Sequence, residues 1–114
     1  MLMYSSVLVT APDLRAANEI GQLMVERGLA ACVNIWEVLS IYRWQGNVKR
    51  EPEAAMLFKV PTEGFEALRS EILKVHPYEV PCMVRYDIAE GHQPYLDWIS
   101  ESVLSVPSEY QKPK

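Results

Sequence analysis

The segment His76-Pro77-Tyr78-Glu79 places an imidazole, a phenol and a carboxylate close together in the chain. It falls where a predicted helix ends and a predicted strand begins, a kind of junction that often carries functional side chains. A neutral imidazole is a common metal ligand and can also transfer a proton near neutral pH. His76 is therefore the best single candidate for a ligand. A histidine in the last turn of a helix can equally serve to complement the helix dipole.

The two cysteines have different predicted surroundings. Cys32 alternates with Val33, so it shares a strand face with Asn34, and its thiol could act as a soft ligand. A lone cysteine among Ala and Val is also often buried and inert, and both interpretations of Cys32 stay open. Cys82 shares the apolar face of a predicted strand with two valines, so we interpret it as a core residue.

Lys59 is the third candidate for binding. It places a single cation between Phe58 and Val60, where burial is expected. It is either a lysine in a ligand pocket or an edge-strand lysine that blocks unwanted strand pairing. Glu53 precedes the apolar part of the same predicted strand, whereas His92 lies in a polar turn where a solvated loop residue is expected.

No catalytic motif accompanies these residues. The sequence contains no GxSxG, HExxH, GxGxxG or P-loop pattern, so we expect a protein that is not an enzyme. The net charge of -4 has the wrong sign for a domain that neutralises phosphates, which argues against a nucleic-acid partner.

Length and composition predict one soluble domain over residues 1–114. The chain has 49% hydrophobic and 23% charged residues, enough of each to bury a core and stay in solution. No apolar run approaches the roughly 20 residues that cross a bilayer. Residues 1–6 lack the basic region of a secretory signal, and the two cysteines form no CxxC pair, so we expect reduced thiols and a cytoplasmic location.

The elements that must position the candidates alternate between strands and helices. Residues 4–11 form a short apolar run typical of a buried strand. Asp13 can cap a helix whose apolar residues recur every three or four positions until Gly28 ends it. Residues 29–60 form a long β-hairpin that reverses at 45–47, with a bend or bulge expected at 37–40, where two alternation patterns fall out of phase.

The second half repeats this pattern. Thr62 can cap a second helix that Pro77 ends, and residues 80–88 alternate strictly as a strand does. A third helix follows Pro94, and only the tail 107–114 looks loose. The order βαββαβ plus a C-terminal helix predicts the α+β, ferredoxin-like fold, with two helices on one face of a four-stranded antiparallel sheet.

The predicted hairpin is longer than this sheet needs. Strand arms that extend beyond their own sheet expose unpaired N–H and C=O groups, which invite pairing with another copy of the chain. The hairpin also carries the large aromatic residues Trp36, Tyr42 and Trp44, which would otherwise form an exposed apolar patch. We therefore expect a homo-oligomer.

Five segments resemble, in order and approximate spacing, the CutA divalent-cation-tolerance proteins. The resemblance covers nearly the whole chain, and HPYEVP is its most distinctive part. The segments are Thr10-Ala11-Pro12, Leu29-Ala30-Ala31-Cys32-Val33-Asn34, Ser40-Ile41-Tyr42-Arg43-Trp44-Gln45-Gly46, His76-Pro77-Tyr78-Glu79-Val80-Pro81 and Tyr95-Leu96-Asp97-Trp98. The resemblance implies a ferredoxin-like protomer in a tight homotrimer built like the PII signalling proteins, with hairpins paired between subunits.

The resemblance also implies a cytoplasmic role in tolerance to divalent metal ions, with copper or another divalent cation as ligand and no organic cofactor. Family members proposed to bind copper carry a Cys and a second His where this chain has Val9 and Val75. Of that set only His76 remains, and one imidazole cannot make a tight copper site. Cys32 and Glu53 match family positions near the cleft between subunits and are the other metal ligands that we expect.

Three functions are compatible with this element order. The preferred one is a non-enzymatic trimer that binds divalent metal ions or a small ligand in clefts between subunits. The alternative is a small hydrolase of the acylphosphatase type, for which Arg15 is the nearest match to a phosphate-binding arginine, although no glycine-rich loop surrounds it. An RNA-recognition module is disfavoured by the acidic charge and by the apolar residues 54–57. The expected cleft residues are Asn34, Trp44, Lys59 and Tyr78, together with His76 and Glu53.

Overall fold

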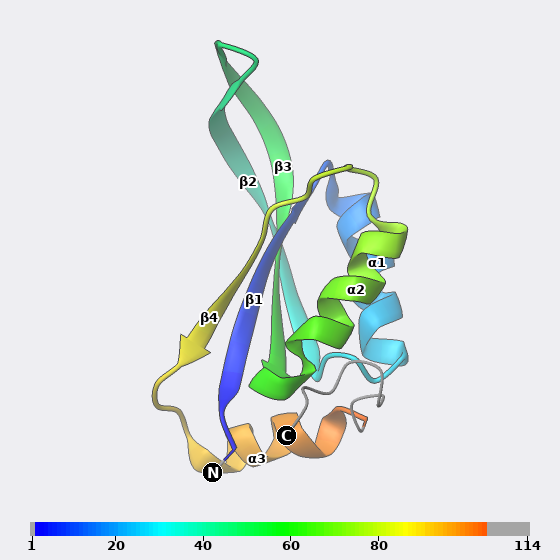
Figure 1. Ribbon diagram of the computed structural model, residues 1–114, viewed down its shortest axis with the longest axis vertical. Coiled ribbons are helices and arrows are strands. Elements are labelled where there is room, and N and C mark those ends of the chain that lie inside the picture. The colour runs from blue at the N-terminus through cyan, green and yellow to red at the C-terminus, as the bar shows by residue number, and fades with distance from the viewer. Residues whose placement is uncertain (1, 105–114) are drawn as a thin grey trace.

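The computed structural model describes residues 2–104 as an antiparallel sheet with helices packed on it (Figure 1). The strand order across the sheet is β2-β3-β1-β4. This order confirms the predicted ferredoxin-like α+β fold, whereas the tail 107–114 lies outside the described residues. The elements are β1 (Tyr4–Ala11), α1 (Leu14–Glu26), β2 (Cys32–Trp44), β3 (Asn47–Pro61), a 3-10 turn (Thr62–Gly64), α2 (Phe65–Val75), β4 (Met83–Ile88) and α3 (Gln93–Ser102).

Helices α1 and α2 cover one face of the sheet, as Figure 1 shows. Alternate residues of a strand point to opposite faces, and on β1 and β3 the residues that face these helices are fully buried. Apolar burial of this kind is the main force that holds the sheet and the helices together. The core between the two layers contains Val7, Val9, Met56, Phe58 and Val60 from the strands and Ile20, Met24, Leu68 and Ile72 from the helices.

The ends of α1 confirm two predictions. The Asp13 carboxylate accepts a hydrogen bond from the N–H of Ala16 at 2.8 Å, which satisfies one of the free donors at the helix start. At the other end Gly28 adopts φ +72°, a left-handed conformation that glycine adopts without strain. Leu104 packs where a Gly28 side chain would lie, so this position also requires a small residue.

The expected cap of α2 is wrong. Thr62 begins a single 3-10 turn, and the residue before α2 is Gly64, which makes no side-chain capping bond. The Thr62 hydroxyl instead lies 2.6 Å from the hydroxyl of the buried Ser5. The expected end of α2 is confirmed, because the helix stops at Val75, two residues before Pro77.

The β2–β3 hairpin is continuous. Its register runs without interruption from the pair Cys32–Lys59 to the pair Trp44–Asn47, so the bulge expected at 37–40 is wrong. The two residues between the strands, Gln45 and Gly46, both have positive φ, as a type I′ turn requires. The alternation changes phase at 37–40 because the outer part of the hairpin extends beyond the helices. In that part both faces of the hairpin carry apolar residues.

Strand β4 is shorter than predicted and forms an edge of the sheet. It begins at Met83, and the predicted core residue Cys82 is exposed. The register places Val84 opposite Leu8, on the face of the sheet away from α1 and α2. The predicted alternation is therefore present in β4. The apolar side of this strand points away from the main core, and Val84 is exposed.

The face of the sheet away from α1 and α2 is called the open face below. Helix α3 covers one end of it, where Leu96 and Ile99 pack with Tyr4 and Ala31. The β2–β3 hairpin projects from the opposite end of the molecule (Figure 1). Between these ends the open face is covered by no element among residues 2–104, although it carries partly exposed apolar side chains.

The substitution Phe58→Ala tests the position of the core. Phe58 is fully buried under the helices, so its loss should reduce the free energy of unfolding by about 3–5 kcal/mol. Leu73→Ala, at an exposed position of α2, should cost less than about 1 kcal/mol. Urea unfolding measures both, and equal losses would contradict this assignment of the core.

Candidate functional site

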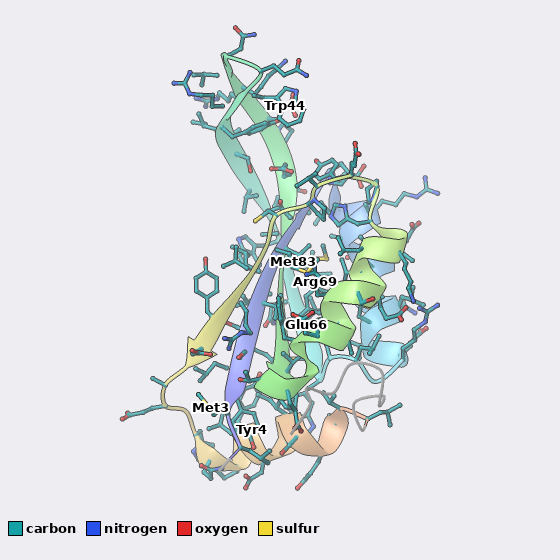
Figure 2. The ribbon with its side chains drawn as sticks, in the orientation of Figure 1. Met3, Tyr4, Trp44, Glu66, Arg69 and Met83 are labelled. Carbon is teal, nitrogen blue, oxygen red and sulfur yellow. The ribbon has the colours of Figure 1, made fainter. Side chains whose placement is uncertain are left out.

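The predicted site residues lie in three separate places. Glu53, His76 and Tyr78, the loop group, meet where the segment after α2 passes the end of β1. A second set, the lysine group (Cys32, Asn34 and Lys59), lies on the open face. Trp44 is close to the end of the hairpin, far from Tyr4 at the opposite end of the molecule (Figure 2).

His76 uses both of its ring nitrogens inside the protein. Its Nε2–H donates to the backbone carbonyl of Thr10 at 2.8 Å, because a carbonyl oxygen can only accept. Its Nδ1 accepts from the backbone N–H of Tyr78 at 3.0 Å, so this nitrogen carries no proton. The side chain is buried, and through these two bonds its ring joins the loop to β1. A metal ion could bind either nitrogen only by breaking one of these bonds.

Tyr78 connects this histidine to a carboxylate. Its hydroxyl donates to Glu53 Oε2 at 3.0 Å, and its ring lies 5.1 Å from the His76 ring between centroids. Partial burial, followed by the Glu53 hydrogen bond and charge, raises the pKa of Tyr78 to about 12. The phenol therefore stays protonated near neutral pH and acts as a hydrogen-bond donor to Glu53.

A similar pair lies next to the loop group on the hairpin. The Tyr42 hydroxyl donates to Glu51 Oε2 at 3.0 Å, and this bond is the main reason that the pKa of Tyr42 is raised. The Glu51 charge also contributes to the raised pKa of Tyr78, so the two Tyr–Glu pairs interact electrostatically. Sequence reasoning missed Glu51, whose only signal was its position almost opposite Tyr42 in the hairpin register.

The lysine group is held by two hydrogen bonds. Lys59 Nζ donates to Asn34 Oδ1 at 3.3 Å, and Cys32 Sγ lies 3.5 Å from the Tyr95 hydroxyl of α3. The bond to Cys32, followed by partial burial, raises the pKa of Tyr95 to about 12. The Tyr95 ring stacks on Trp98 with centroids 5.6 Å apart. The sequence identified Tyr95 only as part of the third predicted helix and of a segment that resembles the family, because helical spacing does not reveal a contact with a distant strand.

These positions do not fit a copper site within one chain. Cys32 lies opposite Lys59 in the register, and Lys59 is six residues (59 minus 53) from Glu53 along β3, which places Cys32 and Glu53 roughly 20 Å apart. Among the described residues no three His, Cys, Asp or Glu side chains are grouped so that they could hold a metal ion. A tight copper site needs several donors in one place. The predicted metal ligands of a single chain are not brought together.

The family comparison follows from this fold and these segments. Residues 5–102 match the family described as CutA1 divalent ion tolerance protein. The chain belongs to this family. It is 46% identical over 101 residues to the divalent-cation tolerance protein CutA of Thermus thermophilus, which covers 88% of this chain and 98% of that protein. It is also 38% identical over 103 residues to the human protein CutA, which covers 90% of this chain and 58% of that protein.

Solved structures of CutA proteins share the fold. The structure of the periplasmic divalent cation tolerance protein CutA from Archaeoglobus fulgidus superposes with a TM-score of 0.87 at 37% identity, covering 90% of this chain and all of that one. CutA from Synechococcus elongatus gives a TM-score of 0.87 at 35% identity, covering 91% and 93% of the two chains. The resemblance predicted from the sequence segments is confirmed, as is the fold that it implied.

The raised tyrosine pKa values predict how stability changes with pH. A tyrosine whose pKa is raised from 10.0 to about 12 by folding stabilises the fold fully below about pH 10. This stabilisation is lost as the pH rises from about 10 toward 12. Tyr78→Phe should therefore make the decline of the unfolding free energy over this interval shallower.

Tyr86→Phe is the matched control, because the exposed Tyr86 makes no hydrogen bond within residues 2–104. Chemical unfolding at several pH values, followed together with tyrosinate absorbance, measures the effect. An identical decline in wild type and Tyr78→Phe would be evidence against the Tyr78–Glu53 bond.

Proposed function

We propose that the chain acts without catalysis in tolerance to divalent metal ions, as a homotrimer that binds a metal ion or a small ligand in the clefts between its subunits. The observation that carries this proposal is the amount of strand edge and apolar surface that one chain leaves uncovered. The names of its relatives, divalent-cation tolerance proteins, support the metal-related role.

Unpaired strand edges favour assembly through the hairpin. Strand β3 pairs with β1 only over residues 54–61, so in the described part of the chain no strand pairs with residues 47–53 on that side. The outer side of β2 has no neighbour either among residues 2–104. Exposed edges of this length invite pairing with another chain. The large apolar side chains exposed on the hairpin are Trp36, Leu39, Ile41, Trp44 and Val48.

The open face provides a second surface for assembly. Val84 is 43% exposed and Tyr86 is 50% exposed there, and Val80, before β4, is 87% exposed. Exposed apolar side chains of this size are typical of protein interfaces. The number of subunits, three, comes from the family resemblance, and edge pairing that closes into a ring is compatible with it.

A site between subunits would bring together the candidate metal ligands that lie apart within one chain. One chain keeps Cys32 and Glu53 far apart, so a site with several donors needs side chains from more than one subunit. Cys32 and Glu53 are the proposed donors. His76 would have to give up its bond to Thr10 or to Tyr78 before it could join them.

The alternative, a hydrolase of the acylphosphatase type, has no support in this geometry. Arg15 lies at the start of α1 with an 88% exposed side chain and pairs with Glu19 at 3.4 Å. It therefore points into solvent rather than into a loop that could cradle a phosphate.

We also propose a cytoplasmic location. The two cysteines are free thiols and lie far apart in the chain, in keeping with a reducing compartment. No helix within residues 2–104 has the length and hydrophobicity required to span a membrane. The relative from Archaeoglobus fulgidus is described as periplasmic, which makes the compartment a useful point to test by fractionation.

Ile41→Pro should prevent trimer formation. In an antiparallel hairpin with a two-residue turn, the N–H of Ile41 belongs to a non-hydrogen-bonded pair and points away from β3, toward a neighbouring chain. Proline removes this donor, whereas Ile41→Ala keeps it. Light scattering should give a trimer mass for wild type and Ile41→Ala, and a smaller mass for folded Ile41→Pro. A monomer mass for wild type at micromolar concentration would overturn the proposed assembly.

Copper binding should depend on assembly. If the donors come from different subunits, the wild-type trimer should bind Cu(II) in native mass spectra and folded Ile41→Pro should bind at least tenfold more weakly. Glu53→Gln should weaken copper binding. Glu51→Gln is the matched control, because Glu51 lies two residues before Glu53 on the same strand, and this variant should bind copper like wild type. Equal copper affinity of the trimer and the disrupted variant would contradict a site between subunits.

A further inference from the structure

Lys59 differs from every other basic side chain within residues 2–104. Five of these side chains form ion pairs with Asp or Glu: Arg15, Arg27, Arg69, Lys74 and Arg85. Three more, Arg43, Lys49 and Arg50, are exposed to solvent at the far end of the hairpin. Lys59 is partly buried, and unlike the side chain of Arg85, which is also partly buried but pairs with Asp87, it has no carboxylate partner among the described residues. A partly desolvated charge is stabilised by a counter-charge, and residues 2–104 do not supply one.

The surroundings of Lys59 are neutral and rich in hydrogen-bond donors. Cys32 and Ser6 lie directly opposite Lys59 on the two neighbouring strands, so all three share the open face. Asn34 accepts the bond from Lys59 through Oδ1, which leaves its NH₂ group able to donate. The Tyr95 hydroxyl lies next to Cys32 and is protonated near neutral pH, as tyrosine hydroxyls are.

Apolar side chains lie beside these donors. The next row of the open face contains Leu57 and Leu8, which are directly opposite each other and partly buried. Helix α3 bounds the other side through Tyr95 and its stacked neighbour Trp98. One cation with several neutral donors between apolar walls has the chemistry of a site for a small anion, because each donor strengthens when water is excluded.

We propose that Lys59, together with Asn34 and Ser6, binds a small oxyanion, a carboxylate or phosphate group, on the open face beside α3. This site rests on the proposed function in one respect, because it specifies the small ligand of the cleft between subunits. Assembly would cover the open face and reduce the screening of the Lys59 charge by water. The ligand is small, since the overall negative charge of the chain does not favour an extended polyanion.

The experiment compares two lysines of the same strand and face. Lys59→Met removes the charge but keeps most of the side-chain volume, and Lys49→Met does the same ten residues (59 minus 49) away on β3. Calorimetric titration with inorganic phosphate and, separately, with succinate at constant ionic strength measures binding to each assembled protein. The affinity for one or both anions should fall at least tenfold in Lys59→Met and stay unchanged in Lys49→Met. The anion that binds more tightly shows whether the site prefers a phosphate or a carboxylate group.

Three results would overturn the proposal: no binding of either anion by wild type, equal loss in both lysine variants, or dissociation of the oligomer by Lys59→Met without any anion effect. The last would mean that a carboxylate of a second copy is the partner of Lys59. If Lys59→Met does not fold, Asn34→Ala replaces it and should weaken anion binding severalfold. The oligomer mass and copper affinity of the same samples report separately on the proposed function, so failure of the anion site leaves that function intact.

Discussion

The length of β3 is the constraint on which the rest of the structure depends. Its residues 54–61 lie between β1 and β2 under the helices and form the centre of the core, while its residues 47–53 extend beyond β1 and pair, within residues 2–104, with no strand other than β2. One strand thus contains a mostly buried half and a mostly exposed half. The helices cover one face of the half that lies beside β1, so the strand edge of the other half and the open face stay uncovered within residues 2–104. Surfaces of this kind are typical of protein interfaces.

The same constraint separates the candidate binding residues. Glu53 lies where β3 leaves the core and Lys59 lies within the covered half, so residues of one strand belong to two different environments. Near Glu53, the Tyr78 backbone N–H donates to the His76 ring, and the Tyr78 hydroxyl donates to the Glu53 carboxylate. Within residues 2–104, the only partner of the Lys59 ammonium group is the Asn34 amide. The side chains of His76 and Tyr78 therefore already have partners within the chain, whereas the charge of Lys59 lacks a counter-charge among the described residues.

The sequence predicted the strands, the helices and their order well, because alternation and helical spacing report directly on which side of an element is buried. It failed where burial depends on what covers a face: Cys82 belongs to an apolar stripe that points away from the helices, and the phase change near 37–40 marks the edge of the core instead of a bulge. The resemblance suggested His76 as a ligand, but a residue type cannot reveal that both ring nitrogens are already bonded. The contact of Tyr95 with Cys32 joins elements 63 positions apart and has no local signal.

Amide hydrogen exchange of the hairpin edges tests the central claim, that other copies of the chain cover what one chain leaves open. The N–H groups of Ile41, Arg43, Val48 and Arg50 belong to non-hydrogen-bonded pairs of the hairpin and point outward from it. If edge pairing between copies occurs, at least one of these two outward rows should be strongly protected from exchange at concentrations where the protein is assembled. Exchange of all four amides at the rate of an unstructured chain, under the same conditions, would contradict the account.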